Sequence, residues 1–147
     1  MAAYTQILYH IVFGTKDRRQ TLDAENHESL WKYVSGVIRG KQCAVYTVGG
    51  FTEHIHILCS LHPSMALADM VKDIKLAVSA WNKAEKVFPA FSGWAEGYGA
   101  FTCSVRDKDR IYHYIRNQHE HHRVKSYQEE LEEMLRKAGV EYDRRYL

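Results

Sequence analysis

The sequence contains little cysteine and little proline. Its three cysteines lie far apart, are odd in number and form no C-x-x-C pair, so neither a disulfide framework nor a cysteine zinc site is expected. Two prolines in 147 residues leave little room for a disordered linker. We therefore predict buried thiols in a reducing compartment and a single domain that spans residues 1–147.

Long hydrophobic runs are also missing. The N-terminal "YTQILYHIVFG" has a short apolar core that contains a histidine, and it lacks the basic flank and cleavage site of a signal peptide. No run reaches the roughly 18 apolar residues of a membrane-spanning helix. The sequence thus predicts a cytoplasmic protein without a membrane segment.

Charge of one sign is not in excess. The formal net charge of +2 says little about partners, but the charges are unevenly distributed. Acidic residues concentrate at 129–133, whereas basic residues gather at 16–19, 39–41, 106–110, 116 and 123–125. Solvated faces and a surface for a polyanion are both compatible with these clusters.

What the sequence does contain is an interleaved pattern of strands and helices. Strands are expected over residues 4–14, 42–50, 53–61 and 100–105, and helices over 23–40, 64–83, 107–122 and 126–139. Residues 140–147 fit neither pattern. This order predicts an α+β fold in which helices pack on one antiparallel or mixed sheet of four to five strands.

Two histidines alternate with isoleucines in the strand expected over 53–61. Side chains two apart in a strand point the same way about 7 Å apart, so His54 and His56 could converge on one metal ion while Ile55 and Ile57 face the core. A divalent ion then needs a third donor from elsewhere in the fold. Two solvated histidines on a half-exposed strand are the alternative that the sequence leaves open.

The helix expected over 107–122 offers both a donor and a nucleophile. Tyr114 and Gln118 are four residues apart and share one helix face, and His121 and His122 follow one turn later. A half-buried tyrosine and a solvated glutamine on an amphipathic helix are the alternative. Tyr112 and Tyr127 are competing nucleophiles, but Tyr112 lies about 200° around the helix from Tyr114.

Together, the motifs His54-Ile55-His56 and Tyr114-x-x-x-Gln118 resemble those of the single-tyrosine HUH transposases, which are the TnpA-like enzymes of small insertion sequences and their REP-associated relatives. "YHIVFGTKDRR", "GYGAFTCSV" and the C-terminal portion from "YIRNQHEHH" onward extend the resemblance along the chain. The resemblance implies a ferredoxin-like or RRM-like sheet, a homodimer, and binding of single-stranded DNA that folds into hairpins.

The resemblance also implies residue roles. Tyr114 attacks a phosphodiester and leaves a 5′-phosphotyrosine and a free 3′-hydroxyl, while His54, His56 and Gln118 bind Mg²⁺ or Mn²⁺. The metal orients the scissile phosphate, and imidazole ligands by themselves favour Mn²⁺ or heavier metals. If the tyrosine helix serves a partner subunit's site, the glycines at 93, 97 and 99 are possible hinges.

Basic side chains with tyrosines and tryptophans nearby are expected to bind the DNA, through phosphate contacts and base stacking. The predicted phosphate contacts are Lys16, Arg18, Arg19, Arg106, Lys108 and Arg116.

Four alternatives remain open. One is a housekeeping relative that cleaves chromosomal hairpin repeats, and another is a replication or relaxase-type HUH nuclease. A third is a zinc hydrolase that uses His54 and His56 with a carboxylate such as Glu53 or Glu120. The fourth is a protein that binds hairpin DNA without cleaving it.

Overall fold

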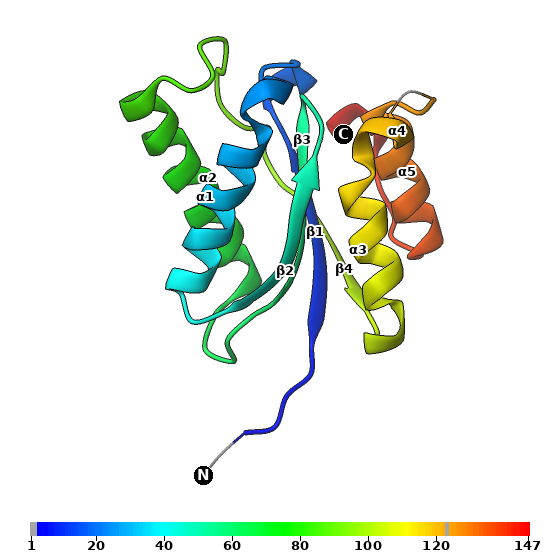
Figure 1. Ribbon diagram of the computed structural model, residues 1–147. Helices are drawn as coiled ribbons and strands as arrows, with labels where there is room; N and C mark the ends of the chain where they lie inside the picture. Colours follow the sequence, from blue (N-terminus) through cyan, green and yellow to red (C-terminus); the bar gives the residue numbers. More distant parts are fainter. Residues whose placement is uncertain (1–2, 123) are drawn as a thin grey trace.

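The computed structural model describes residues 3–122 and 124–147. Four strands form one antiparallel sheet in the order β2-β3-β1-β4 (Figure 1). The strands are β1 (Leu8–Gly14), β2 (Ala44–Gly50), β3 (His54–Ser60) and β4 (Gly99–Cys103). The helices are α1 (His27–Gly40), α2 (Leu67–Glu85), α3 (Lys108–Arg116), α4 (Gln118–His121) and α5 (Tyr127–Lys137). The β-α-β-β-α-β order and this strand order confirm the predicted ferredoxin-like α+β fold.

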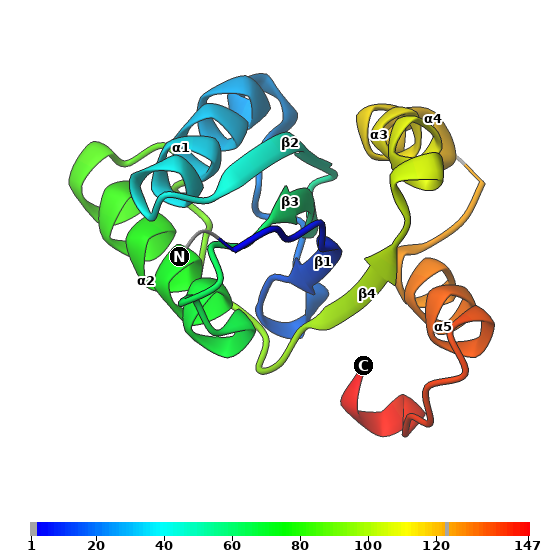
Figure 2. The ribbon, with the colours of Figure 1, turned by 90° about the horizontal axis from the view of Figure 1, so that it is seen from below.

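The helices lie on both faces of the sheet. In Figures 1 and 2, α1 and α2 cover one face, whereas α3, α4 and α5 lie on the other. The main core lies under α1 and α2, where β1 contributes Ile11 and Phe13 and β3 contributes Ile55 and Ile57, each at most 1% exposed. The prediction that the two isoleucines face the core is therefore confirmed.

The opposite face carries the histidines. His56 pairs with Gly49 of β2 on one side and with Val12 of β1 on the other, and Val12 pairs in turn with Gly99 of β4. The two outer strands, β2 and β4, thus each place a glycine in line with His56 across the sheet. A glycine has no side chain, so a helix can approach the sheet closely there. A Cβ at Gly49 would lie 2.5 Å from the carbonyl oxygen of Ile115 in α3, and one at Gly99 would lie 3.4 Å from Leu131 of α5.

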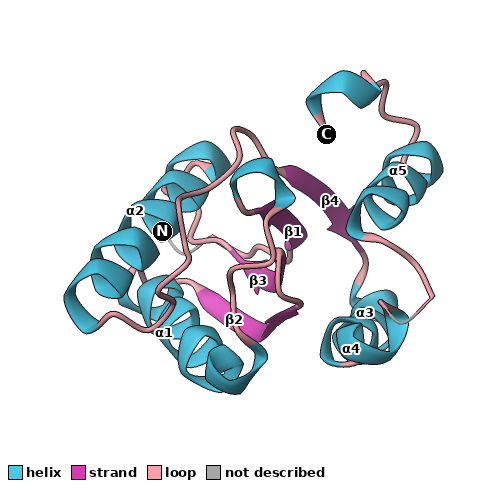
Figure 3. Ribbon diagram, turned by 90° about the horizontal axis from the view of Figure 1, so that it is seen from above, coloured by secondary structure: helices cyan, strands magenta, loops and turns pink. Residues whose placement is uncertain are grey.

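On this face, α3 lies toward the β2 edge of the sheet and α5 toward the β4 edge (Figure 3). The histidines of the two central strands therefore lie between the two helices. The fold therefore brings β3, α3 and α5, which are far apart in the sequence, close together.

Some element boundaries differ from the predictions. The first strand begins at Leu8 because Leu8 is the first residue that pairs with β4, and the preceding Ile7 is half exposed. The second helix begins at Leu67, three residues after Ser64. The helix expected over 107–122 breaks at Asn117, whose ψ of 25° ends α3 and starts α4.

The last helix matches its prediction more closely. The Ser126 hydroxyl accepts a hydrogen bond from the amide of Glu129, which caps α5. The unassigned tail contains a short 3-10 turn over Arg144–Tyr146.

The three cysteines are free thiols. Cys43 and Cys59 are buried as predicted, whereas the prediction is wrong for Cys103, which is half-buried at the end of the edge strand β4. Burial raises the pKa of the Cys59 thiol to about 12, so it stays protonated at neutral pH. Among the residues described, no helix combines the length and the apolar character needed to cross a membrane.

Candidate active site

His54 and His56 point into the protein rather than into water, since both are 0% exposed. Nε2 of His56 lies 3.0 Å from Glu130 Oε1, and Nδ1 of His56 lies 2.8 Å from Nε2 of His10 on β1. The interpretation of this pair as two solvated histidines is therefore wrong. The alternation of β3 places both rings on the face that α3 and α5 cover.

His54 is oriented by partners on both ring nitrogens. Its Nδ1 lies 2.6 Å from Glu53 Oε1, and its Nε2 lies 3.0 Å from Gln118 Oε1. The ring also stacks on Tyr127 with a centroid separation of 4.3 Å and an interplanar angle of 8°. Gly14 leaves the space for Tyr127, because a Cβ at Gly14 would lie 2.9 Å from the tyrosine ring.

Gln118 and Tyr114 join this cluster from α4 and α3, so the structure brings the four predicted site residues together. The Gln118 amide nitrogen donates to the Tyr114 carbonyl at 3.3 Å, which keeps the two residues one turn apart despite the helix break. The Tyr114 hydroxyl donates to Glu130 Oε2 and lies 3.4 Å from Nε2 of His121.

Glu130, which was not predicted from the sequence, lies at the centre of the cluster. Its side chain is 2% exposed, and Oε1 lies 3.3 Å from Nε2 of both His54 and His122 in addition to its contact with His56. The segment "EELEE" was interpreted only as a concentration of charge. A usable signal was available: Glu130 lies three residues after Tyr127 and one before Leu131, on the apolar stripe of a helix whose start Ser126 marks.

His122 and His10 are two further members that the sequence did not single out as ligand candidates. Nε2 of His122 lies 2.8 Å from Gln118 Oε1, while its Nδ1 lies 2.7 Å from the carbonyl oxygen of Lys125. Both ring nitrogens of His122 therefore have a partner, and Nε2 is directed into the cluster.

The histidines differ in charge because their carboxylate partners differ. Burial by itself lowers the pKa of His54, but contacts with Glu130 and Glu53 outweigh it and raise the pKa to about 9. Burial lowers the pKa of His56 to about 4 and that of His10 to about 3, so both are neutral. Burial would raise the pKa of Glu130, yet its bonds to His122, His54 and His56 hold it well below the ordinary value.

Of the three tyrosines considered as nucleophiles, Tyr114 has its hydroxyl inside the cluster. Tyr112 is 37% exposed and lines a separate pocket with Trp31 and Arg116. Tyr127 contributes its ring to the stack on His54. Burial and the charge of Glu130 raise the pKa of the Tyr114 phenol, so it needs activation before it can attack.

The donor atoms fit a divalent metal ion. Donors bound at about 2.1 Å and at right angles to one another are about 3.0 Å apart, and the contacts among these residues run from 2.8 to 3.3 Å. Ligand atoms of His54, His122 and Glu130 all lie within 4.8 Å of one another. Imidazole, amide and carboxylate donors suit Mn²⁺ or Zn²⁺ better than Mg²⁺.

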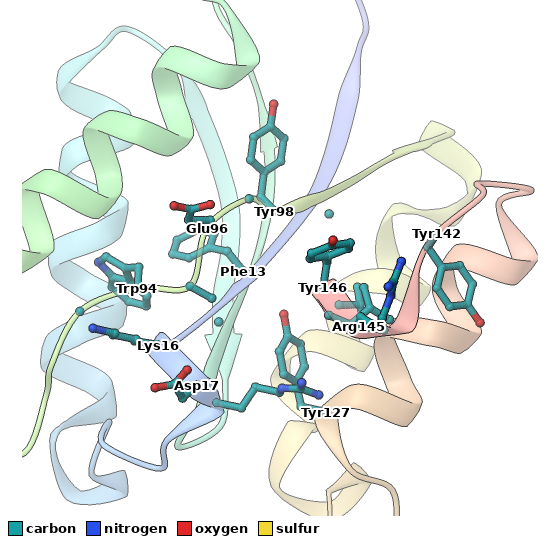
Figure 4. Close-up of a pocket in the computed structure, with 18 of the residues that line it drawn as sticks. Phe13, Lys16, Asp17, Trp94, Glu96, Tyr98, Tyr127, Tyr142, Arg145 and Tyr146 are labelled. Atoms are coloured by element: carbon teal, nitrogen blue, oxygen red, sulfur yellow. The ribbon is translucent and has the colours of Figure 1, made fainter.

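A groove of about 1160 Å³ adjoins the cluster on the α5 side (Figure 4). Tyr127 links the two, because its ring lines the groove and also stacks on His54. Lys16, Arg18 and Arg145 line the groove together with Asp17 and Glu96. Its aromatic lining consists of Phe13, Trp94, Tyr98, Tyr127, Tyr142 and Tyr146.

The other predicted DNA contacts are not among the residues that line the groove, although Arg19 contacts Asp17 and Ser92, which do. Arg116 lines the smaller pocket of about 290 Å³, and the Lys108 ammonium lies 4.7 Å from the centre of the Tyr46 ring. Arg19 pairs with Asp17 at 3.6 Å, and Arg106 is exposed just after β4. Arg123, from the basic cluster at 123–125, lies outside the described residues.

Comparison with known proteins identifies the family of this chain. The sequence model of the family described as "Transposase IS200 like" matches residues 3–118. The ISDra2 transposase TnpA of Deinococcus radiodurans is 27% identical over 125 residues, covering 78% of this chain and 86% of the relative.

Two solved structures share the fold, each with a TM-score of 0.60. The crystal structure of a putative transposase from Deinococcus radiodurans R1 is 24% identical and is matched over 80% of this chain and 95% of its own. A REP-associated tyrosine transposase bound to a REP hairpin is 16% identical and is matched over 83% of this chain and 74% of its own. Because the family match covers most of the sequence and includes the strand of His54 and His56 and the helix of Tyr114, this chain belongs to the IS200-like, TnpA-like family of tyrosine transposases.

Proposed function

We propose that this chain, as one HUH transposase domain over residues 1–147, cleaves and rejoins single-stranded DNA through Tyr114. The observation that carries the proposal is the position of the Tyr114 hydroxyl, which lies inside a buried cluster with His54, His56 and Gln118. A tyrosine hydroxyl beside possible metal donors suits nucleophilic attack on a phosphodiester.

The reaction is a transesterification. The Tyr114 oxygen forms a bond to phosphorus and loses its proton, while the bond between phosphorus and the 3′ oxygen breaks and the departing oxygen gains a proton. A 3′-hydroxyl that attacks the 5′-phosphotyrosine reverses the step. The bond energy is kept in the protein–DNA link, so rejoining needs no external energy source.

His54, His56 and Gln118 are the proposed metal ligands, with Mg²⁺ or Mn²⁺ as the metal. When bound, the ion polarises the scissile phosphate and neutralises the developing charge. Glu53 would orient the ligand His54. Its carboxylate contacts Nδ1 of His54, so that Nε2 faces the cluster.

The groove beside Tyr127 is the proposed path of the unpaired strand. Lys16 and Arg18 can contact phosphates there, and Trp94 and Tyr98 offer ring faces for bases (Figure 4). The relative that was solved with a REP hairpin supports DNA with hairpin ends as the partner. A homodimer and a cytoplasmic location remain predictions.

A REP-associated housekeeping nuclease is the second candidate, because one of the structural relatives is a REP-associated tyrosine transposase. Its chemistry would be the same. Short imperfect palindromes at both ends of the gene would favour a mobile element, whereas palindromes scattered through the chromosome would favour the housekeeping role.

The decisive experiment incubates the protein and Mn²⁺ with labelled hairpin oligonucleotides that carry single-stranded flanks. We expect a covalent adduct on denaturing gels in the unmodified protein and in Tyr112→Phe, and none in Tyr114→Phe. An adduct that persists in Tyr114→Phe would refute the assignment. His56→Ala should lose cleavage but retain hairpin binding, and binding without cleavage by the unmodified protein would identify a silent DNA-binding relative.

A further inference from the structure

We propose that the segment after the family match supplies two further ligands to the metal site, His122 and Glu130. The inference rests on the proposed function, because it concerns the same ion. The family match ends at residue 118, so the predicted ligands lie within it and these two lie beyond it. Ligand atoms of His54, His122 and Glu130 all lie within 4.8 Å of one another, so these three residues can bind one ion together.

The first support is the position of Glu130 Oε1. That single oxygen lies 3.0 Å from Nε2 of His56 and 3.3 Å from Nε2 of both His54 and His122. These spacings are the ones that neighbouring ligands of one ion adopt. A carboxylate present only to support the fold would not need to face three imidazole nitrogens at once.

The second support is the orientation of His122. Its side chain is 2% exposed although it follows a short surface helix. The Lys125 carbonyl holds Nδ1 at 2.7 Å, and Nε2 faces Gln118 Oε1 at 2.8 Å. Metal-binding histidines usually have one ring nitrogen fixed by such a backbone partner.

Charge is the third support. A carboxylate that is 2% exposed requires a positive partner, since an isolated buried charge is strongly unfavourable. In the described part of the chain the ion-pair partners of Glu130 are all histidines. A divalent cation bound in the cluster would be a further positive partner, and the imidazoles that bind it would be neutral.

The fold also holds Glu130 in place. Ser126 caps α5, and Tyr127, Leu131 and Leu135 pack with Val12 of β1, so the side chain one residue before Leu131 faces the cluster. The other carboxylate oxygen, Oε2, accepts the hydrogen bond from Tyr114. Glu130 would therefore position the nucleophile's hydroxyl next to the ion.

The test measures the affinity of the full-length protein for Mn²⁺, from the EPR signal of free Mn²⁺ during titration. The variants are Glu130→Gln, which keeps the shape of the side chain, His122→Asn, and Glu129→Gln as an exposed control on the same helix. We expect the first two to bind Mn²⁺ at least about tenfold more weakly and the control to bind unchanged. Pulsed EPR of bound Mn²⁺ should show one fewer coordinated imidazole in His122→Asn.

Circular dichroism of the metal-free variants reports whether they fold, and if Glu130→Gln does not fold, His122→Asn decides the outcome. Unchanged Mn²⁺ affinity in the folded variants would overturn the inference. Tighter binding by Glu130→Gln would also overturn it, because the carboxylate would then occupy the place of the ion. The DNA adduct of the unmodified protein is scored separately, so either failure is distinguishable from failure of the proposed function.

Discussion

Gly49 and Ile115 are in contact through their backbones: a Cβ on Gly49 would lie 2.5 Å from the carbonyl oxygen of Ile115. This contact holds α3 against β2 of the same chain, next to Tyr114. The ring centroids of Tyr114 and His56 are consequently 5.8 Å apart. Tyr114 and His56 of the same chain therefore lie close together.

The first prediction is that cleavage occurs within one chain. A mixture of Tyr114→Phe and His56→Ala should stay inactive, because neither chain carries both the tyrosine and the complete histidine pair. The measurement is adduct formation on hairpin DNA after the two inactive variants are mixed, or co-expressed to allow subunit exchange. Restored cleavage would show that the tyrosine helix serves a partner's site, with the glycines at 93, 97 and 99 as candidate hinges.

The second prediction concerns the close approach at Gly49. Gly49→Ala should displace α3 and lower the free energy of unfolding by about 1–3 kcal/mol, as overpacking does. Adduct formation should fall with it, because Tyr114 moves with the helix. The matched control is Gly36→Ala in α1, whose Cβ meets nothing within 4 Å and should stabilise the protein by up to about 1 kcal/mol. Equal stability of the two variants in urea unfolding would contradict the packing argument.

The third prediction separates a packing role of the Tyr127 ring from a chemical role of its hydroxyl. Tyr127→Phe keeps the ring that stacks on His54, so the covalent adduct and the stability should be nearly unchanged. Tyr127→Ala removes a buried aromatic ring and should cost about 3 kcal/mol or more in unfolding free energy. Loss of the adduct in Tyr127→Phe, with normal thermal unfolding, would show instead that this hydroxyl takes part in the reaction.

The fourth prediction concerns the groove. If Lys16 contacts a phosphate of the unpaired strand, Lys16→Ala should weaken binding of single-stranded DNA. The slope of log affinity against log salt should also become shallower by about 0.7. Lys83→Ala, an exposed lysine in the last turn of α2, is the control and should leave both quantities unchanged. Fluorescence anisotropy at several salt concentrations measures them, and an unchanged slope in Lys16→Ala would exclude this contact.

Patterns of short range were predictable from the sequence. The period of two along β3 placed His54 and His56 on one face and Ile55 and Ile57 on the other, and burial of all four shows that both faces are covered. Helix boundaries were less accurate. Nothing in the composition of 107–122 signalled the break at Asn117. Tyr114 and Gln118 nevertheless remain one turn apart, because the Gln118 side-chain amide donates a hydrogen bond to the Tyr114 carbonyl across the break.

The sequence by itself determined the fold class, through the order of its strand and helix patterns. It also determined that His54 and His56 share one face of a strand, because strand geometry converts a spacing of two residues directly into direction. Only the tertiary structure decided that Glu130 and His122 lie in the same cluster. Their positions depend on how α4 and α5, which lie far from the histidines in the sequence, pack across the sheet, and on glycines that let the helices approach. Such packing is set by the shapes of many side chains together, which no local pattern of residues records.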